Sequence, residues 1–344
     1  MSEARYFHVT QQGKLVVMDS FEKAASALQD GGYMWLDFYR PDRDQLTLLA
    51  RPLGLHPLSV EDCTDANQMP KIEDYQKNTF IIFNALEYAA GSIEVDEVDI
   101  FLGPDYLITI SGYGSSGART LKDIEQVVLH NSDAISQGPA FLLHIVLDYV
   151  VDRKFAAIEA LEEELTKTEE QMLASPSGFN PARLLDLRRN LLAVRKSLFH
   201  EREILVKICR RDSQYIPEKS IFHFRDIYDH LAKFFELAEA YREIVTSLME
   251  LHMSMLNNMM ARTANETNAT VRRLTFITTI FMPLTLLAGI FGMSEWTMMT
   301  GQSNWRAAYP AFFLAMALVG IVNYLLLKKI GRRENDPDQR RRDA

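Results

Sequence analysis

An uncharged apolar run near the C-terminal end leaves this chain few folds to choose from. Residues 274–293, with the sequence LTFITTIFMPLTLLAGIFGM, contain no Asp, Glu, Lys or Arg. The run has the length of about 20 residues that a helix needs to cross the hydrocarbon core of a bilayer. Backbone groups find no water there, so the segment must be helical. A second such run, residues 308–327, follows after a short connection, and the two together predict a helical hairpin in a membrane.

Basic residues flank both runs on the side away from the connection. Arg272 and Arg273 precede the first run, and Lys328 and Lys329 follow the second. The connection carries one basic residue, Arg306. An excess of Lys and Arg marks the cytoplasmic side of a membrane. We therefore expect both termini in the cytoplasm and the connection on the outside.

The composition limits the function. The formal net charge is -9 at pH 7 and the basic residues gather at the extreme C-terminus, so we expect no nucleic-acid partner, which requires a broad basic face. A mean hydropathy of -0.11 indicates a soluble body with a C-terminal membrane part. The sequence shows no Walker-type phosphate loop, catalytic triad or paired general acid and base, which argues against an enzyme or an ATP-driven pump. Cys63 and Cys209 lack metal-ligand spacing, so we expect them reduced and structural.

The chain ahead of the membrane divides into two parts. Up to residue 140, β-rich runs at 14–18, 33–38, 79–85, 98–102 and 106–112 alternate with amphipathic segments at 21–29 and 42–49, which predicts a sheet covered by helices. Long helices follow, at 139–173 and from Pro181 to about 211. From residue 220 no proline occurs before Pro283, so one helix of about 70 residues, roughly 100 Å long, is expected to run from cytoplasm into membrane.

These patterns predict six parts. They are a cytoplasmic α/β domain at 1–140, a helical stalk at 141–273, a first transmembrane helix at 274–293, an external loop at 294–307, a second transmembrane helix at 308–328 and a basic cytoplasmic tail at 329–344.

Small polar and apolar residues alternate along one face of the first span. Steps of three and four residues give the stripe Asn268, Val271, Leu274, Thr278, Met282, Thr285 and Gly289. The opposite face carries large apolar residues that suit lipid or the second span: Phe276, Ile277, Ile280, Phe281, Leu284 and Leu287. Apolar constrictions between polar rings gate channels by dewetting, so the stripe predicts a pore lining. Two helices cannot enclose water, so a pore needs several copies of the chain. The alternative is that Thr278 and Thr285 only bond to their own backbone.

Three motifs resemble the CorA family of magnesium channels, within the two-transmembrane GxN superfamily. The segment IFMPLTLLAGIFGM at residues 280–293 is similar to the family's IFxPLTxxAGIYGMN. Upstream, HPLSVED and QMPKIEDY within residues 56–75 resemble HPLxxED and QRPKxExY, and FRDIYDH at 224–230 resembles FRDxYDH. The matched residues of the span are Ile280, Phe281, Pro283, Leu284, Thr285, Ala288, Gly289, Ile290, Gly292 and Met293.

The resemblance implies an α+β membrane protein that forms a homopentameric funnel, with the pore face on the stripe already found from spacing. It implies a selectivity motif at Gly292, Met293 and Ser294, where serine replaces the family's asparagine. Mg²⁺ keeps its water shell and prefers oxygen partners, so a shorter hydroxyl ring grips that shell less firmly. Glu295 in the external loop offsets this by attracting cations.

The resemblance also implies that Asp226 binds Mg²⁺ between subunits and closes the pore when the cation is plentiful. Its expected acidic partner would lie near Tyr88, and Glu87 or Glu94 are the substitutes that this chain offers. A competing metal-ligand set, His56 with Glu61 and Asp62, has no second histidine at a useful spacing, which favours a structural role. The acidic run at 162–164 is either a solvated helix face or a cation reservoir that offsets the charge of the basic tail. The basic tail has a second interpretation of its own, a contact with lipid headgroups.

The function predicted is transport of a divalent cation, Mg²⁺ first, through a channel in a bacterial inner (plasma) membrane, driven by the membrane potential. Mg²⁺ is then both substrate and regulator, and no organic cofactor is expected. Two alternatives stay open at this point. One is a carrier of Zn²⁺ or another transition metal, coupled to protons. The other is a non-conducting envelope protein that senses cations, which the Ser294 substitution keeps in view.

Overall fold

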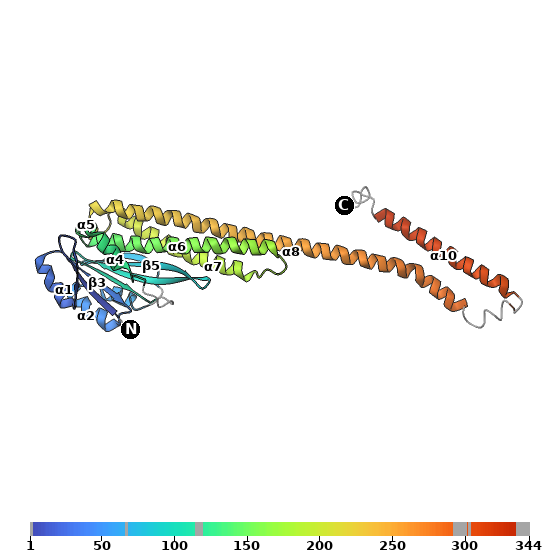
Figure 1. Ribbon diagram of the computed structural model, residues 1–344, viewed down its shortest axis with the longest axis horizontal. Coiled ribbons are helices and arrows are strands. Elements are labelled where there is room, and N and C mark those ends of the chain that lie inside the picture. The colour runs from blue at the N-terminus through green and yellow to red at the C-terminus, as the bar shows by residue number, and fades with distance from the viewer. Residues whose placement is uncertain (1–2, 66–67, 114–119, 292–300, 302–303, 335–344) are drawn as a thin grey trace. The chain divides into compact units, whose positions relative to one another are not determined.

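The computed structural model describes residues 3–65, 68–113, 120–291, 301 and 304–334. The chain divides into two compact units, Met1–Met253 and Ser254–Ala344. The first holds a β-sheet and several helices, and the second holds the two apolar helices (Figure 1).

A seven-stranded sheet forms the base of the first unit. Its strands are β1 (Glu3–Val9), β2 (Leu15–Met18), β3 (Tyr33–Tyr39), β4 (Lys71–Asp74), β5 (Thr79–Ala89), β6 (Ser92–Leu102) and β7 (Tyr106–Ser111). Their order is β2-β1-β3-β7-β6-β5-β4, with β3 and β7 parallel and the other pairs antiparallel. The five runs expected from the sequence are all strands. β1 and β4 were not expected, because EARYFHV and KIED carry too many charges to look like strands and depend on their neighbours for pairing.

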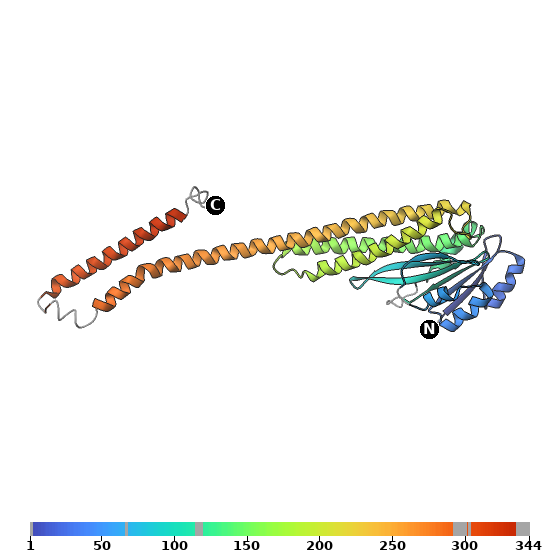
Figure 2. The ribbon, with the colours of Figure 1, turned by 180° about the vertical axis from the view of Figure 1, so that it is seen from behind.

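Helices cover both faces of the sheet. Short helices α1 (Phe21–Ala27), α2 (Arg43–Leu53) and α3 (Pro57–Asp62) lie on one face, where Leu46, Val60 and Cys63 join the buried strand residues. A capping box of Asp42 and Gln45 starts α2. The other face is covered by α4 (Ile124–His130), α5 (Ser132–Ile135) and α6 (Pro139–Ala174). Both ribbon views show the long helices stacked over this second face (Figures 1 and 2).

The long helices confirm the expected periodicity closely. α6 has proline at its first position, α7 (Ala182–Cys209) follows Pro181, and a single turn η2 (Glu218–Ser220) leads into α8. α8 (Ile221–Phe291) is 71 residues long and continues through Pro283. The sheet face shares one continuous apolar core with α6, α7 and the first part of α8, so the sheet and these helices fold as a single unit.

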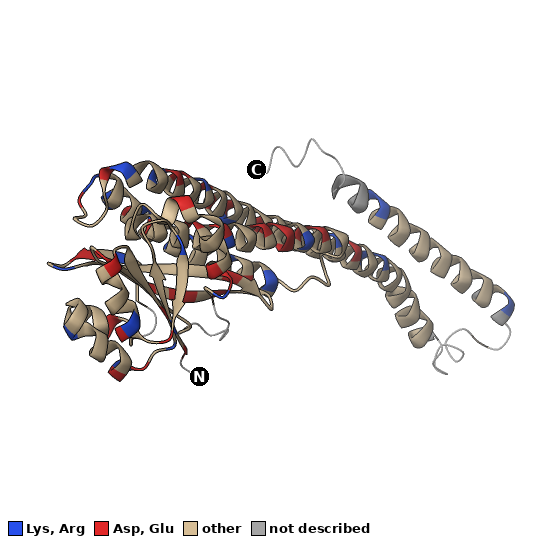
Figure 3. Ribbon diagram, turned by 60° about the vertical axis from the view of Figure 1, so that its left-hand side comes forward, with Lys and Arg blue, Asp and Glu red and all other residues tan. Residues whose placement is uncertain are grey.

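The second unit consists of the end of α8 and helix α10 (Trp305–Glu334). Both helices contain an apolar segment with the length and composition of a membrane span, and the mean hydropathies of these segments are 1.6 and 2.1. Neither segment is buried in the structure, unlike the core helix of a soluble protein. Figure 3 shows charged residues spread along the ribbon of the first unit, whereas those of α10 lie towards its two ends. The chain is therefore a membrane protein with two C-terminal transmembrane helices.

Candidate ion path and regulatory site

The two apolar helices pack against each other along matching faces. On α8 the partly buried residues are Phe276, Ile280, Pro283, Leu284 and Leu287. On α10 they are Phe312, Met316, Val319, Gly320, Asn323 and Leu327. A Cβ placed on Gly320 would lie 3.8 Å from Cδ1 of Leu284, which is ordinary van der Waals contact and shows that Leu284 packs against α10 at this position. Of the apolar face expected from the sequence, Ile277 and Phe281 stay 55% and 60% exposed.

The predicted pore stripe lies on the other side of α8. Val271, Leu274 and Met282 are 54%, 63% and 70% exposed, and the remaining stripe residues are also exposed: Asn268, Thr278, Thr285 and Gly289. Turning about 100° per residue puts the stripe nearly opposite the face that meets α10. A polar stripe that neither the partner helix nor its own helix covers must meet lipid, water or another chain.

The stripe threonines bond to their own helix. The Thr278 hydroxyl donates to the Leu274 carbonyl and the Thr285 hydroxyl to the Phe281 carbonyl, both at 2.9 Å. The alternative stated from the sequence, that these threonines bond to their own backbone, is therefore confirmed for the hydrogen bonds. It also leaves each hydroxyl oxygen with lone pairs that point away from the backbone. Such oxygens accept hydrogen bonds from the water shell of a cation, so backbone bonding and a cation path are compatible.

An open groove forms on the exposed side of α8 around Pro283. Proline lacks the backbone N–H that would bond the carbonyl of Thr279, so the helix is weakened at this point. The groove has a volume of about 980 Å³. Four stripe residues line it with five others, namely Thr278, Met282, Thr285 and Gly289 beside Ile277, Phe281, Pro283, Leu286 and Ile290. Nothing lies within 4 Å of a Cβ built on Gly289, so this flank is open within one chain.

The predicted selectivity motif, Gly292, Met293 and Ser294, lies outside the described residues, and so does Glu295. Of the basic tail, Arg340, Arg341 and Arg342 also lie outside them.

Asp226 stands exposed on α8, beside a polar patch on α6 that spacing alone did not single out. Burial lowers the pKa of His144 to about 4, His223 adds to this effect and Asp226 opposes it. Burial raises the pKa of Asp148, His230 opposes that rise, and Asp226 adds to it. Aspartate and histidine therefore gather at this face of α6 and α8. The sequence does contain the spacing that places these residues on one face of each helix. Positions 144 and 148 are four residues apart on α6, and positions 223, 226 and 230 are three and four residues apart on α8.

The acidic partners expected for Asp226 are engaged elsewhere or hidden. Glu87 pairs with Arg153 at 3.3 Å. Glu94 lies directly opposite Glu87 in the β5–β6 hairpin, and one of its oxygens is buried without a hydrogen-bond partner. Within the described part of one chain, no three His, Cys, Asp or Glu side chains are placed to hold a metal ion. A cation at Asp226 would need ligands from a second chain.

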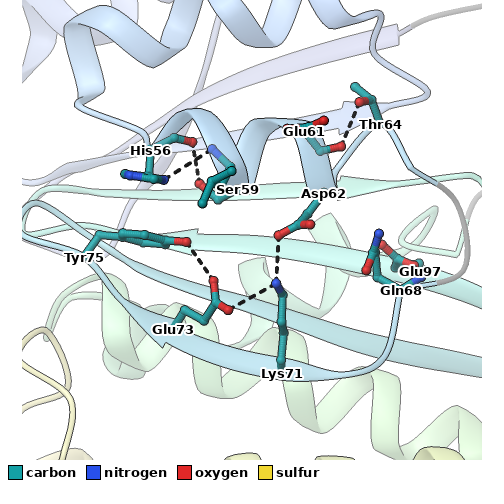
Figure 4. Close-up of polar contacts among 11 residues, drawn as sticks. His56, Ser59, Glu61, Asp62, Thr64, Gln68, Lys71, Glu73, Tyr75 and Glu97 are labelled. Carbon is teal, nitrogen blue, oxygen red and sulfur yellow. Dashed lines mark hydrogen bonds and ion pairs between the residues drawn. The ribbon is translucent and has the colours of Figure 1, made fainter.

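The His56 segment is structural, as the sequence favoured (Figure 4). His56 caps α3 by accepting a hydrogen bond from the Leu58 backbone at 3.2 Å, and its ring stacks on Tyr75 at 4.6 Å. Asp62 bonds Lys71 at 2.8 Å, so the segment ties α3 to β4.

The acidic run on α6 is mainly solvated. Glu162 and Glu163 are exposed, and Glu163 pairs with Lys167 one turn along at 2.7 Å. The contacts of this run fit a solvated helix face.

Known proteins match over nearly the whole chain. The CorA-like Mg2+ transporter protein family matches residues 30–329. YfjQ of Bacillus subtilis is 30% identical over 292 residues, which cover 85% of this chain and 87% of YfjQ. The cobalt/magnesium transport protein CorA of Thermotoga maritima is 29% identical over 279 residues, 80% of this chain and 76% of that protein.

The complete structure of the CorA magnesium transporter from Methanocaldococcus jannaschii superposes with a TM-score of 0.67 at 24% identity. The superposition covers 96% of this chain and 97% of that one, so the architecture is shared from the sheet to the apolar helices. The family match, the two apolar helices and the shared fold agree: the chain belongs to the CorA-like Mg²⁺ transporter family and is a divalent metal ion transporter, not an enzyme.

Proposed function

We propose that this chain forms a homopentameric Mg²⁺ channel in a bacterial inner (plasma) membrane, with five copies of α8 around a central path. Both termini lie in the cytoplasm, and the residues between α8 and α10 face outward. The stripe from Asn268 to Gly289 lines the path, and Asp226 regulates it from the cytoplasmic side.

The observation that carries the proposal is the exposure of the stripe opposite α10. In hydrocarbon, the Thr278 and Thr285 hydroxyls satisfy their donors within the helix, but their oxygens keep acceptor capacity that only water or another chain can use. α10 already covers the other side of α8, so lipid is excluded from that side and not from this one. Assembly around an axis gives all seven stripe residues a common aqueous surface. Closed cyclic symmetry is the simplest way for identical chains to enclose a path.

The residues of the path favour a hydrated hard cation. Hydroxyl and amide oxygens can accept hydrogen bonds from the water around Mg²⁺, which loses its shell reluctantly. The membrane potential is sufficient to drive inward flow. A potential of 100 mV contributes about 2.3 kcal/mol per charge, and Mg²⁺ carries two charges. No energy-coupling site is needed.

Ion flux into liposomes tests the proposal. The purified full-length protein is reconstituted, a potassium gradient with valinomycin sets the potential, and an entrapped dye reports Mg²⁺. We expect uptake that rises with an inside-negative potential. Parallel runs use Zn²⁺, Co²⁺ and Ni²⁺ with and without a proton gradient. Zn²⁺ uptake that follows the proton gradient would identify a coupled carrier instead. The absence of uptake for all four ions would identify a non-conducting protein.

Ser294 controls cation binding at the outer mouth. We expect Ser294→Asn to tighten Mg²⁺ binding there by about tenfold, because a longer side chain with an amide oxygen reaches the water shell better than a hydroxyl. The measurement is the Mg²⁺ concentration that gives half-maximal flux. Ser294→Ala, which removes the hydroxyl, is the matched control and should weaken binding. An unchanged or weaker affinity in the asparagine variant would contradict this role.

Asp226 supports closure by cytoplasmic Mg²⁺. We expect Mg²⁺ to protect the wild-type protein from limited proteolysis, and Asp226→Asn to raise the Mg²⁺ needed for half protection by about tenfold or more, since a bond to a charged group contributes about 1.5–3 kcal/mol. Asp229→Asn, an equally exposed aspartate one turn away, is the control and should behave as wild type. Proteolysis that ignores Mg²⁺ in the wild type would exclude this regulation.

A further inference from the structure

Two acidic residues of β6 lie buried on the sheet face that α2 and α3 cover. Glu97 and Asp99 are two positions apart on one strand, so their side chains share that face. Asp99 is 0% exposed and Glu97 is 7% exposed. Neither the sequence motifs nor the transport function accounts for two acids in this place. The neighbours of Asp99 in the adjacent strands are apolar, Ile82 of β5 and Ile110 of β7, whereas Glu97 lies opposite Asn84 of β5.

Asp99 has only a weak partner as a carboxylate. Among the described residues, no N–H or O–H donor bonds either of its oxygens, and the Cys63 thiol is the weak donor that favours its ionised form. The group within hydrogen-bonding reach is the carboxyl of Glu97, with the Cys63 thiol nearby. Two carboxylates repel each other and cannot bond without a proton. A bond between them therefore requires that the pair hold one proton.

Glu97 also holds the chain between α3 and β4. Its second oxygen accepts a hydrogen bond from the Gln68 backbone N–H at 2.8 Å. Figure 4 shows Glu97 beside Gln68, towards the end of α3 that carries Asp62. Gln68 precedes β4 by only three residues, so this bond fastens the segment that leads into the edge strand. Glu97 therefore contacts Asp99 with one part of its carboxyl group and the Gln68 backbone amide with the other.

We propose that Glu97 and Asp99 share one proton, and that this proton keeps residues 68–71 fastened to the sheet as a pH-sensitive latch. When the proton leaves to solvent, two adjacent negative charges remain in an apolar layer. Glu97 is the more accessible of the two, so it turns outward and releases the Gln68 amide. Asp99 has no route to water without that movement.

The surrounding groups reinforce the need for a proton. Asp62 of α3, Cys63 directly after that helix and Tyr113 after β7 face the pair, and Asp96 adds its charge from β6. The cation on β4, Lys71, is occupied by Asp62 at 2.8 Å and Glu73 at 3.2 Å. Burial raises the pKa of Asp99 well above its usual range, and Glu97 adds to the rise. The folded pKa therefore exceeds the unfolded pKa of about 3.9. The stabilisation is complete below that value and is lost as the pH rises towards the folded pKa, by up to about tenfold in the folding equilibrium per pH unit.

Hydrogen exchange on the full-length protein in detergent micelles tests the latch. Mass spectrometry follows peptides that contain the Gln68 amide between pH 6 and pH 9, in wild type and in Asp99→Asn. The variant keeps the size of the side chain and a neutral donor, and comparison at equal pH cancels the intrinsic base catalysis of exchange. We expect wild-type protection at Gln68 to fall by about tenfold or more relative to Asp99→Asn over this range. The control amide is that of Ile93, which is on the same strand and is held by Asn190 at 3.1 Å.

Two outcomes would overturn the proposal. One is equal protection of Gln68 in wild type and Asp99→Asn at every pH. The other is a parallel loss at Ile93, which would mean general loosening of β6. Should Asp99→Asn fail to fold, Glu97→Gln replaces it, because its amide oxygen still accepts the Gln68 N–H without a charge. That variant must then show protection at Gln68 that is independent of pH.

Discussion

Replacing Glu201 by leucine should lower the free energy of unfolding of the first unit by about 3–5 kcal/mol, because it strands a buried ammonium group. Nζ of Lys154 on α6 lies 2.6 Å from Oε1 of Glu201 on α7, and both side chains are 0% exposed. Lys154 also sits over the ring of Phe83 at 4.7 Å. Burial lowers the pKa of Lys154 and raises that of Glu201, while each charge opposes the shift of the other.

The pair lies beside a part of β5 that β4 is too short to cover. β4 pairs with β5 only as far as Ile82, so the outer edge of β5 at Asn84 has no strand beside it among the residues that the structure describes. Glu201 accepts a hydrogen bond from the Asn84 backbone N–H at 3.0 Å, and Lys154 donates to the Asn84 carbonyl. The two side chains therefore supply the bonds that a longer β4 would have made. Their loss leaves a buried backbone donor and acceptor unpaired, which costs about 1–3 kcal/mol each.

A double-mutant cycle measures this coupling. Glu201→Leu, Lys154→Met and the double variant are unfolded with urea in detergent and followed by circular dichroism. Removing both charges should recover part of the loss from either single change, since no buried charge is left alone. We expect a coupling energy of at least about 2 kcal/mol, within the range for contacting residues. The pair Lys167 and Glu163, exposed on the surface of α6, is the control, and its double-mutant cycle should show no measurable coupling. Additive losses at Lys154 and Glu201 would contradict the account.

Placing lysine at Thr278 should abolish most divalent cation flux. In the proposed assembly each copy would present a positive charge to the path. At an effective dielectric constant of about 20, two unit charges 4 Å apart interact by about 4 kcal/mol, and about 1.4 kcal/mol is a factor of ten. We therefore expect Mg²⁺ uptake into liposomes to fall by about 100-fold or more, normalised to the amount of inserted protein.

Thr279→Lys is the matched control for this change. Thr279 is the next residue, is exposed at the same depth, and bonds to its own backbone at Thr275 as Thr278 does at Leu274. It lies about 100° further round the helix, off the stripe. Its replacement should reduce uptake by less than about tenfold. Equal losses in the two variants would show that the stripe does not line the ion path.

Much of the fold could be predicted because its signals are local. The charge-free run and its basic flanks define the spans, and the absence of proline from 220 to 282 predicted the helix that became α8. The strands β3, β5, β6 and β7 were predictable from their β-branched and aromatic residues. β1 and β4 were not, since their stability comes from pairing along the sheet rather than from their own residues.

The candidate site divides in the same way. Spacing along α8 was sufficient to place Asn268, Thr278 and Met282 on one face, because a helix repeats every 3.6 residues. Spacing could not say which face meets α10. The face that meets α10 became known from the contact between Leu284 of α8 and Gly320 of α10. Asp226 was found through the resemblance of its motif, but its neighbours His144 and Asp148 come from α6, about 80 residues earlier in the chain.

The amino-acid order alone was enough for the membrane hairpin and the length of α8, since hydropathy and helical period are properties of neighbouring residues. Packing assigned the roles that depend on distant residues. It turned Lys154, which looks like a solvated helix residue, into the partner of Glu201 at a bare strand edge. It also buried Asp99 beside Glu97, where two ordinary acids must share a proton. Burial depends on what the rest of the chain brings to a position, and no local pattern carries that information.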